Sequence, residues 1–178
     1  CYGFLNSWVE EFGTDTDKAR FKDKEYLVKI LNLIMGTGGK KRRKDIERAE
    51  QGVRLIEYFF DDLCNHYDKF RFDDKTVTAV LEGFAKVYDP ADDNSAWFAK
   101  LKAVASNAGF AAEMSEWKAH PENYKGSVSD AAEILRIAIT GKANSPDLCT
   151  IMGILGKERC LKRLNSENCI SLNKAQTE

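Results

Sequence analysis

The sequence contains no long apolar run and no excess of basic charge. No stretch of its 178 residues approaches the roughly 20 consecutive apolar residues of a membrane-spanning helix or the apolar core of a signal peptide. We therefore expect no membrane segment and a cytoplasmic location. Lys and Arg number 27 against 28 Asp and Glu, and a formal net charge of −1 argues against a chain coated with basic charge for nucleic acid. Any nucleic-acid site must be local.

Metal-ligand and catalytic spacings are also missing. The five cysteines lie far apart without a C-x-x-C pair, and His66 and His120 do not join them in a ligand spacing. We expect free thiols in a reducing compartment and no metal site. Paired carboxylates such as Asp73-Asp74 are adjacent in sequence, so on a helix they point in different directions and make a poor acid–base pair. No catalytic residue is predicted.

The alternating pattern of a β-strand is absent, because apolar residues recur every three or four positions. This period predicts an all-α fold, a helical bundle or cage of two small helical subdomains with no sheet. We place the first at 1–70, beginning with a helix from Tyr2 to Phe12, and the second at 71–164. The polar tail, 165–178, has no periodicity and is expected to fray. The chain begins with cysteine rather than methionine, so we expect a fragment.

Two helices are predicted to meet at a tight turn near the C-terminus. The first opens at Ser127, with Asp130 as a capping-box partner, and closes at Gly141, a residue suited to a left-handed C-cap. Ser145 has the chemistry of an N-cap for the next helix, Pro146 suits its first position, and Asp147 complements the helix dipole. The stripe of apolar residues that follows ends at a glycine.

Two features of the sequence are compatible with a bound polyanion. Arg136 lies one turn from the end of the first helix, near the free N–H groups that begin the second. An ordinary solvated arginine beside an ordinary helix cap explains the same residues. The run Lys40 to Lys44 follows a glycine-rich loop and is either a mobile solvated loop or a phosphate-contacting patch.

Three segments, LRIAITG at 135–141, SPDL at 145–148 and LGKERCLKRL at 155–164, resemble the end of the anticodon-binding region in bacterial glutamate–tRNA ligases. The resemblance is tight from 126 to 164, loose from 8 to 67 and very loose between. In that family an arginine, a hydroxyl residue and a leucine face the anticodon bases. The resemblance implies these roles for Arg136, Ser145 and Leu148, with Ser in place of the more familiar Thr. A looser local alignment adds Arg43.

The resemblance implies recognition of the anticodon of tRNA(Glu), with tRNA(Gln) as a further candidate, by contacts to unstacked bases. Backbone phosphates would be contacted by a set of cations that position the RNA without reading it. The predicted phosphate contacts are Arg42, Lys44, Lys157, Arg159, Lys162 and Arg163.

The family's catalytic signatures, which resemble HIGH and KMSKS, do not occur in this sequence, nor does a glycine-rich phosphate loop. We therefore expect a catalytically inert monomeric fragment without a cofactor. The resemblance assigns ATP and magnesium to a catalytic domain of the same polypeptide. The alternative is a helical protein-interaction module whose basic runs are solvated surface. A third interpretation is a fragment that only stabilises its parent enzyme.

Overall fold

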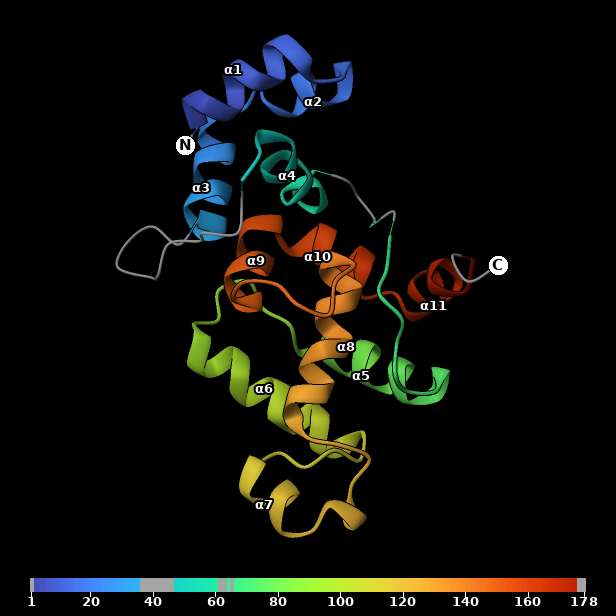
Figure 1. Ribbon diagram of the computed structural model, residues 1–178. Helices are drawn as coiled ribbons and strands as arrows, with labels where there is room; N and C mark the ends of the chain where they lie inside the picture. The colour runs from blue at the N-terminus through green and yellow to red at the C-terminus, as the bar shows by residue number, and fades with distance from the viewer. Residues whose placement is uncertain (1, 36–46, 61–63, 65, 176–178) are drawn as a thin grey trace. The chain divides into compact units, whose positions relative to one another are not determined.

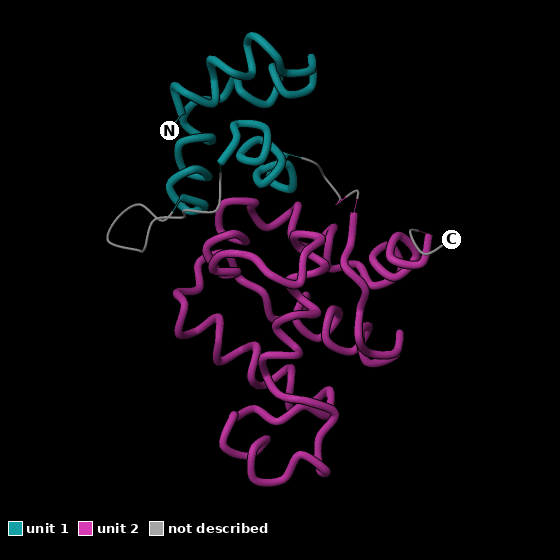
Figure 2. The backbone as a smooth tube through the Cα atoms, viewed as in Figure 1, with its two compact units in different colours: residues 1–61 teal, residues 62–178 magenta. Residues whose placement is uncertain are grey.

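The computed structural model describes residues 2–35, 47–60, 64 and 66–175, which belong to two compact units (Figures 1 and 2). Unit 1 comprises residues 1–61 and unit 2 comprises residues 62–178. Every regular element in these described ranges is a helix, and the one β-type contact is an isolated bridge between Ala111 and Ser127. The all-α prediction is confirmed. The boundary between the units falls after Asp61 rather than after residue 70.

Unit 1 is a small helical cluster around an aliphatic and aromatic core. Its first helix has the predicted bounds, and Leu5 and Val9 form its buried stripe. Phe4 is 69% exposed because it lies outside that stripe. The hydroxyl of Tyr26 donates to the carbonyl oxygen of Phe59 at 2.8 Å and ties the third helix to the last turn. The elements are α1 (Tyr2–Phe12), α2 (Asp15–Arg20), α3 (Lys24–Met35), α4 (Ala49–Arg54) and a 3-10 turn (Glu57–Phe59).

Unit 2 has three mutually packed helices at its centre, with shorter helices around them. The elements are α5 (Asp74–Val87), α6 (Asn94–Asn107), α7 (Met114–Ala119), a 3-10 turn (Pro121–Asn123), α8 (Val128–Thr140), α9 (Leu148–Leu155), α10 (Lys157–Arg163) and α11 (Ser166–Ala175). Helices α5, α6 and α8 pack against one another, and α10 contacts α8, α9 and α11 (Figure 1). Helix α8 therefore packs against α5, α6 and α10, and α9, which follows it after the turn, packs against α10.

The polar tail forms a helix, so the prediction that it frays is wrong for residues 166–175. Helix α11 packs on α5, where the hydroxyl of Ser166 donates to Glu82 Oε1 at 3.0 Å. Cys169 is 1% exposed. Because the buried side of α11 carries a serine and a cysteine rather than large apolar residues, its sequence shows little helical periodicity.

Candidate nucleic-acid interface

The candidate site is built on α8, whose ends match the predicted sequence signals. Ser127 and Asp130 form the capping box, in which the backbone N–H of Ser127 donates to Asp130 Oδ2 at 2.7 Å, and the Ser127 hydroxyl donates to the same oxygen at 2.9 Å. At the other end Gly141 adopts φ +74°, a left-handed conformation that favours glycine. The helix therefore ends one turn after Arg136 and the chain reverses direction.

Arg136 and Ser145, two of the predicted base contacts, lie in direct contact across this turn. The Nε–H of Arg136 donates to the Oγ of Ser145 at 3.0 Å, and that hydroxyl donates to the carbonyl of Pro146 at 3.0 Å. The Arg136 side chain is half-buried, and no carboxylate in the described part of the chain lies within ion-pair distance of it. Only Nε–H is used in this contact, so the N–H groups on both Nη atoms can serve an incoming acceptor.

The start of α9 differs from the prediction. Ser145 does not cap the helix; Asp147 is the N-cap, and its Oδ2 accepts the backbone N–H of Thr150 at 2.9 Å. A carboxylate is a strong N-cap and also complements the positive end of the helix dipole. The cap role of Asp147 leaves the Ser145 hydroxyl to hold the Arg136 guanidinium.

Leu148 is buried, whereas Arg136 and Ser145 are half-buried. It is the first residue of α9 and is 3% exposed, on the same buried stripe as Ile151, Met152 and Leu155. An apolar wall for an unstacked base requires accessible side-chain surface. We therefore correct the predicted set by leaving Leu148 out of the exposed contact surface.

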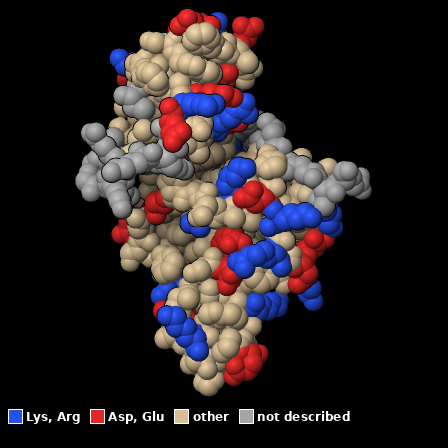
Figure 3. Space-filling model, in the orientation of Figure 1, with Lys and Arg blue, Asp and Glu red and all other residues tan. Residues whose placement is uncertain are grey.

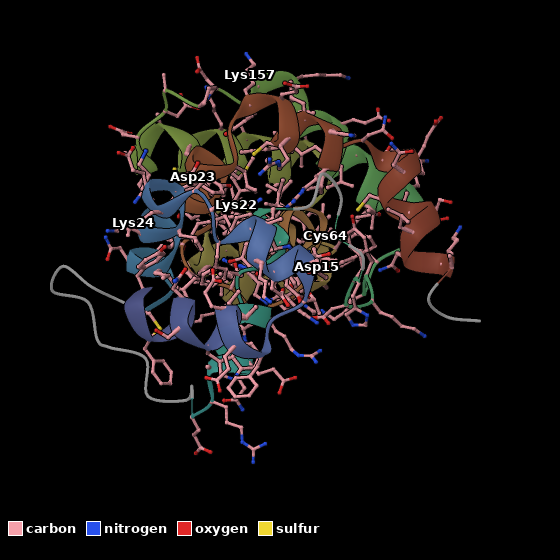
Figure 4. All side chains as sticks on the ribbon, turned by 90° about the horizontal axis from the view of Figure 1, so that it is seen from above. Asp15, Lys22, Asp23, Lys24, Cys64 and Lys157 are labelled. Atoms are coloured by element: carbon pink, nitrogen blue, oxygen red, sulfur yellow. The ribbon has the colours of Figure 1, made fainter. Side chains whose placement is uncertain are left out.

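The four cations predicted on α10 do not share one environment. Lys157 and Lys162 are exposed and Arg159 is half-buried. Figure 4 labels Lys157, the first residue of α10. All three side chains therefore keep some solvent-accessible surface.

Arg163 is the exception, because its side chain is 1% exposed. Its Nη1 donates to the carbonyl oxygen of Ile139 in the last turn of α8. Cys160 and Leu164 are also buried, and the spacing i, i+3, i+4 places Arg163 on the buried stripe of α10. The guanidinium satisfies a helix-terminal carbonyl inside the protein, so the prediction that it contacts phosphate is corrected.

The remaining predicted contacts, Arg42, Arg43 and Lys44, lie outside the described residues, as does the whole basic run from Lys40 to Lys44.

Several basic side chains elsewhere in unit 2 form ion pairs. Arg71 forms ion pairs with both Asp130 and Glu133 at 2.7 Å, and Lys100 pairs with Asp92 at 2.6 Å. On the face shown in Figure 3, basic and acidic side chains are interspersed. Ion pairs therefore neutralise part of the positive charge of unit 2.

The buried cysteines are poorly suited to chemistry. Burial raises the pKa of the Cys160 thiol to about 11 and that of Cys169 to about 12, so both are protonated at neutral pH. Within the described ranges no group of three or more His, Cys, Asp or Glu is placed to hold a metal ion. No helix in those ranges is both long enough and apolar enough to cross a lipid bilayer.

Two residues that shape the turn were not singled out by the sequence. The hydroxyl of Thr140 donates to the carbonyl of Arg136 at 2.8 Å and accepts the N–H of Lys142 at 3.2 Å. The backbone N–H of Asp68 donates to the carbonyl of Gly141 at 2.7 Å. A threonine at the end of a helix is a local signal, whereas a contact from residue 68 has no signal in the sequence.

The chain is similar to known proteins over most of its length. Residues 7–167 match the model of a family described as anticodon binding domain. A glutamate–tRNA ligase of Acetivibrio thermocellus is 34% identical over 165 residues, which cover 92% of this chain and 30% of that relative. Glutamate–tRNA ligases of Sorangium cellulosum (32% over 161 residues; 88% and 28%) and Clostridium perfringens strain 13 (33% over 172 residues; 92% and 31%) are similarly related. The chain spans about 30% of the length of these relatives.

Proposed function

Because the chain belongs to the anticodon binding domain family, we propose that it reads the anticodon of tRNA(Glu), or of tRNA(Glu) and tRNA(Gln), for a glutamate–tRNA ligase. The observation that carries the proposal is the Arg136–Ser145 pair, which presents a guanidinium without a carboxylate partner in the described residues at the corner between α8 and α9. The family resemblance predicted base contacts at these two positions.

Recognition at this corner would use unstacked bases. A planar guanidinium offers a rigid fork of donors to a base edge and a flat face for stacking. The hydroxyl of Ser145 holds Nε, so the Nη donors point in a defined direction before RNA arrives. Discrimination between bases would then come from the positions of acceptors on the base edge.

The exposed cations of α10 would contact the backbone. Lys157, Arg159 and Lys162 can approach phosphates, which positions the anticodon loop without reading its sequence. Their contribution should depend strongly on salt, because each phosphate contact releases condensed counterions.

Glutamate activation, with its ATP and magnesium, is assigned in this proposal to a catalytic domain of a longer polypeptide. This chain would act as the tRNA-reading part of a monomeric cytoplasmic enzyme.

Arg136→Ala is expected to weaken binding of tRNA(Glu) by about 1–3 kcal/mol, roughly 5- to 150-fold in Kd, because a specific base contact is lost. It should also abolish the preference for tRNA(Glu) over a transcript with one anticodon base changed. Arg136→Lys should recover part of the affinity but little of the preference, since an ammonium lacks the donor fork. Filter binding with the two transcripts measures both. An Arg136→Ala chain that keeps the preference would contradict the proposal.

Lys157→Ala is expected to weaken cognate and unrelated tRNAs alike and to reduce the slope of log K against log salt by about one unit. Titrations at four salt concentrations measure the slope. Lys118→Ala is the matched control, because Lys118 is another exposed lysine of unit 2, on α7. Equal slopes for the two variants would remove α10 from the proposed phosphate-binding surface.

A further inference from the structure

We propose that Asp68 is a positioning residue for anticodon recognition, because it fixes the turn that carries Ser145 and thereby directs the guanidinium of Arg136. This inference rests on the proposed function and extends it to a residue far from the recognition pair in sequence. Asp68 acts through the turn and need not touch the RNA.

The carboxylate of Asp68 holds one side of the turn. Its Oδ2 accepts the backbone N–H of Ala143 at 2.7 Å, and its Oδ1 lies 3.8 Å from the Nζ of Lys142. A hydrogen bond from a backbone N–H to a carboxylate is stronger than one between neutral groups. The Lys142 contact is exposed and contributes little. The Ala143 bond is therefore the main restraint from this side chain.

The main chain of Asp68 bonds to the start of the turn, at Gly141, and to α11. Its N–H donates to the carbonyl of Gly141 at 2.7 Å, and its carbonyl accepts the Nδ2 of Asn173, in α11, at 2.9 Å. Gly141 and Ala143 are thus anchored to the same residue, which is itself anchored to the C-terminal helix. A shift of residue 68 would therefore break hydrogen bonds to the α8–α9 turn and to α11.

The restraint on the turn also affects the position of Ser145, which bonds to Arg136. Ser145 follows the anchored turn and precedes the cap of α9, so the turn's geometry determines where its hydroxyl lies. That hydroxyl is the hydrogen-bond partner of Arg136 Nε. Specific recognition requires side chains held to within about 0.5 Å of the productive geometry. A looser turn would leave the guanidinium present but poorly directed.

The experiment compares Asp68→Ala, Asp68→Asn, Arg136→Ala and the double variant Asp68→Ala/Arg136→Ala in the 178-residue chain. Asp68→Asn keeps an oxygen that can accept the Ala143 N–H. Asp74→Ala is the matched control, because Asp74 is an exposed aspartate that pairs with Lys174. The probes are tRNA(Glu) and the same transcript with one anticodon base changed.

Asp68→Ala is expected to lower affinity for tRNA(Glu) about 5- to 10-fold and to reduce the preference between transcripts, while Asp68→Asn and Asp74→Ala stay within about 2-fold. In the Arg136→Ala background, Asp68→Ala should change affinity by less than about 2-fold, because its effect passes through Arg136. An equal loss in both backgrounds, or an unchanged preference in Asp68→Ala, would overturn the inference.

A measurement without RNA separates this inference from the proposed function. The ¹⁵N–¹H resonance of Arg136 Nε should shift, and exchange of the Ala143 amide should accelerate at least about 10-fold, in Asp68→Ala but not in Asp74→Ala. Unchanged Nε and amide signals would overturn the positioning role even if Arg136→Ala abolishes the preference. Altered signals together with an Arg136→Ala chain that keeps the preference would instead contradict the proposed function.

Discussion

Replacing Gly141 with alanine is expected to lower the free energy of unfolding by about 3 kcal/mol, the sum of a backbone and a steric cost. At φ +74° an L-residue with a side chain costs about 1–2 kcal/mol. An added Cβ would also lie 2.0 Å from the carbonyl oxygen of His66 and 3.3 Å from the Cβ of Cys64. Forced overpacking of this kind costs about 1–3 kcal/mol.

The clash cannot be relieved by a rotamer change, because the nearest atom belongs to the backbone. The chain around His66 is hydrogen-bonded to the end of α8 on both sides of that residue. Cys64 Sγ donates to the carbonyl oxygen of Ile139 at 3.3 Å, and the backbone N–H of Asp68 donates to the carbonyl oxygen of Gly141. Any shift therefore stretches hydrogen bonds on both sides of the helix end.

Two other glycines separate the backbone cost from the clash. Gly109 has φ +92°, but its added Cβ would meet only the flexible side chain of Lys125, at 3.4 Å. Gly153 lies within α9 with nothing within 4 Å. In urea denaturation followed by circular dichroism, Gly109→Ala should cost about 1–2 kcal/mol and Gly153→Ala should be neutral or stabilising. A cost for Gly141→Ala no larger than that for Gly109→Ala would contradict the packing described here.

Arg163→Ala is expected to cost about 4 kcal/mol of stability, because it removes a large buried side chain and a charged hydrogen bond together. Truncation of large core side chains costs about 2–5 kcal/mol, and loss of a hydrogen bond from a charged donor costs about 1.5–3 kcal/mol. The carbonyl of Ile139 would keep only the weak thiol donor of Cys64. The same denaturation experiment measures the change.

The adjacent residue supplies the control. Lys162 is exposed, so Lys162→Ala should change stability by at most about 0.5 kcal/mol while it flattens the salt dependence of tRNA binding. Arg163→Ala should show the reverse pattern. A stable Arg163→Ala chain with a flattened salt dependence would mean that this arginine contacts phosphate, as the sequence predicted, and not the end of α8.

The helical fold and the ends of α8 were predictable because their signals are local. Ser127 and Asp130 are three residues apart, and a glycine in a left-handed conformation needs no distant partner. Arg163 was also predictable in principle, since it follows the buried Cys160 by three residues. Four cations in one short helix predict one solvated surface, whereas the helical phase places Arg163 on the buried stripe with Cys160 and Leu164.

Other features depend on contacts between distant residues. Asp147, not Ser145, caps α9, and the serine hydroxyl instead bonds to Arg136, nine residues away. Helix α11 is held by α5, and its order does not come from its own apolar content. Asp68 has no feature that distinguishes it from the other aspartates of the chain, and its partner Ala143 is 75 residues away.

The bonds around Asp68 also bear on the order in which the chain matures during synthesis. Asp68 meets Ala143 across 75 residues and Asn173 across 105, so each helix can form from nearby residues long before the corner is complete. While residue 173 is still inside the ribosome, Arg136 and Ser145 can already be in place, but the hydrogen bond that anchors residue 68 to α11 cannot form. The hydrogen bonds around residue 68 are therefore completed after most of the helices can form.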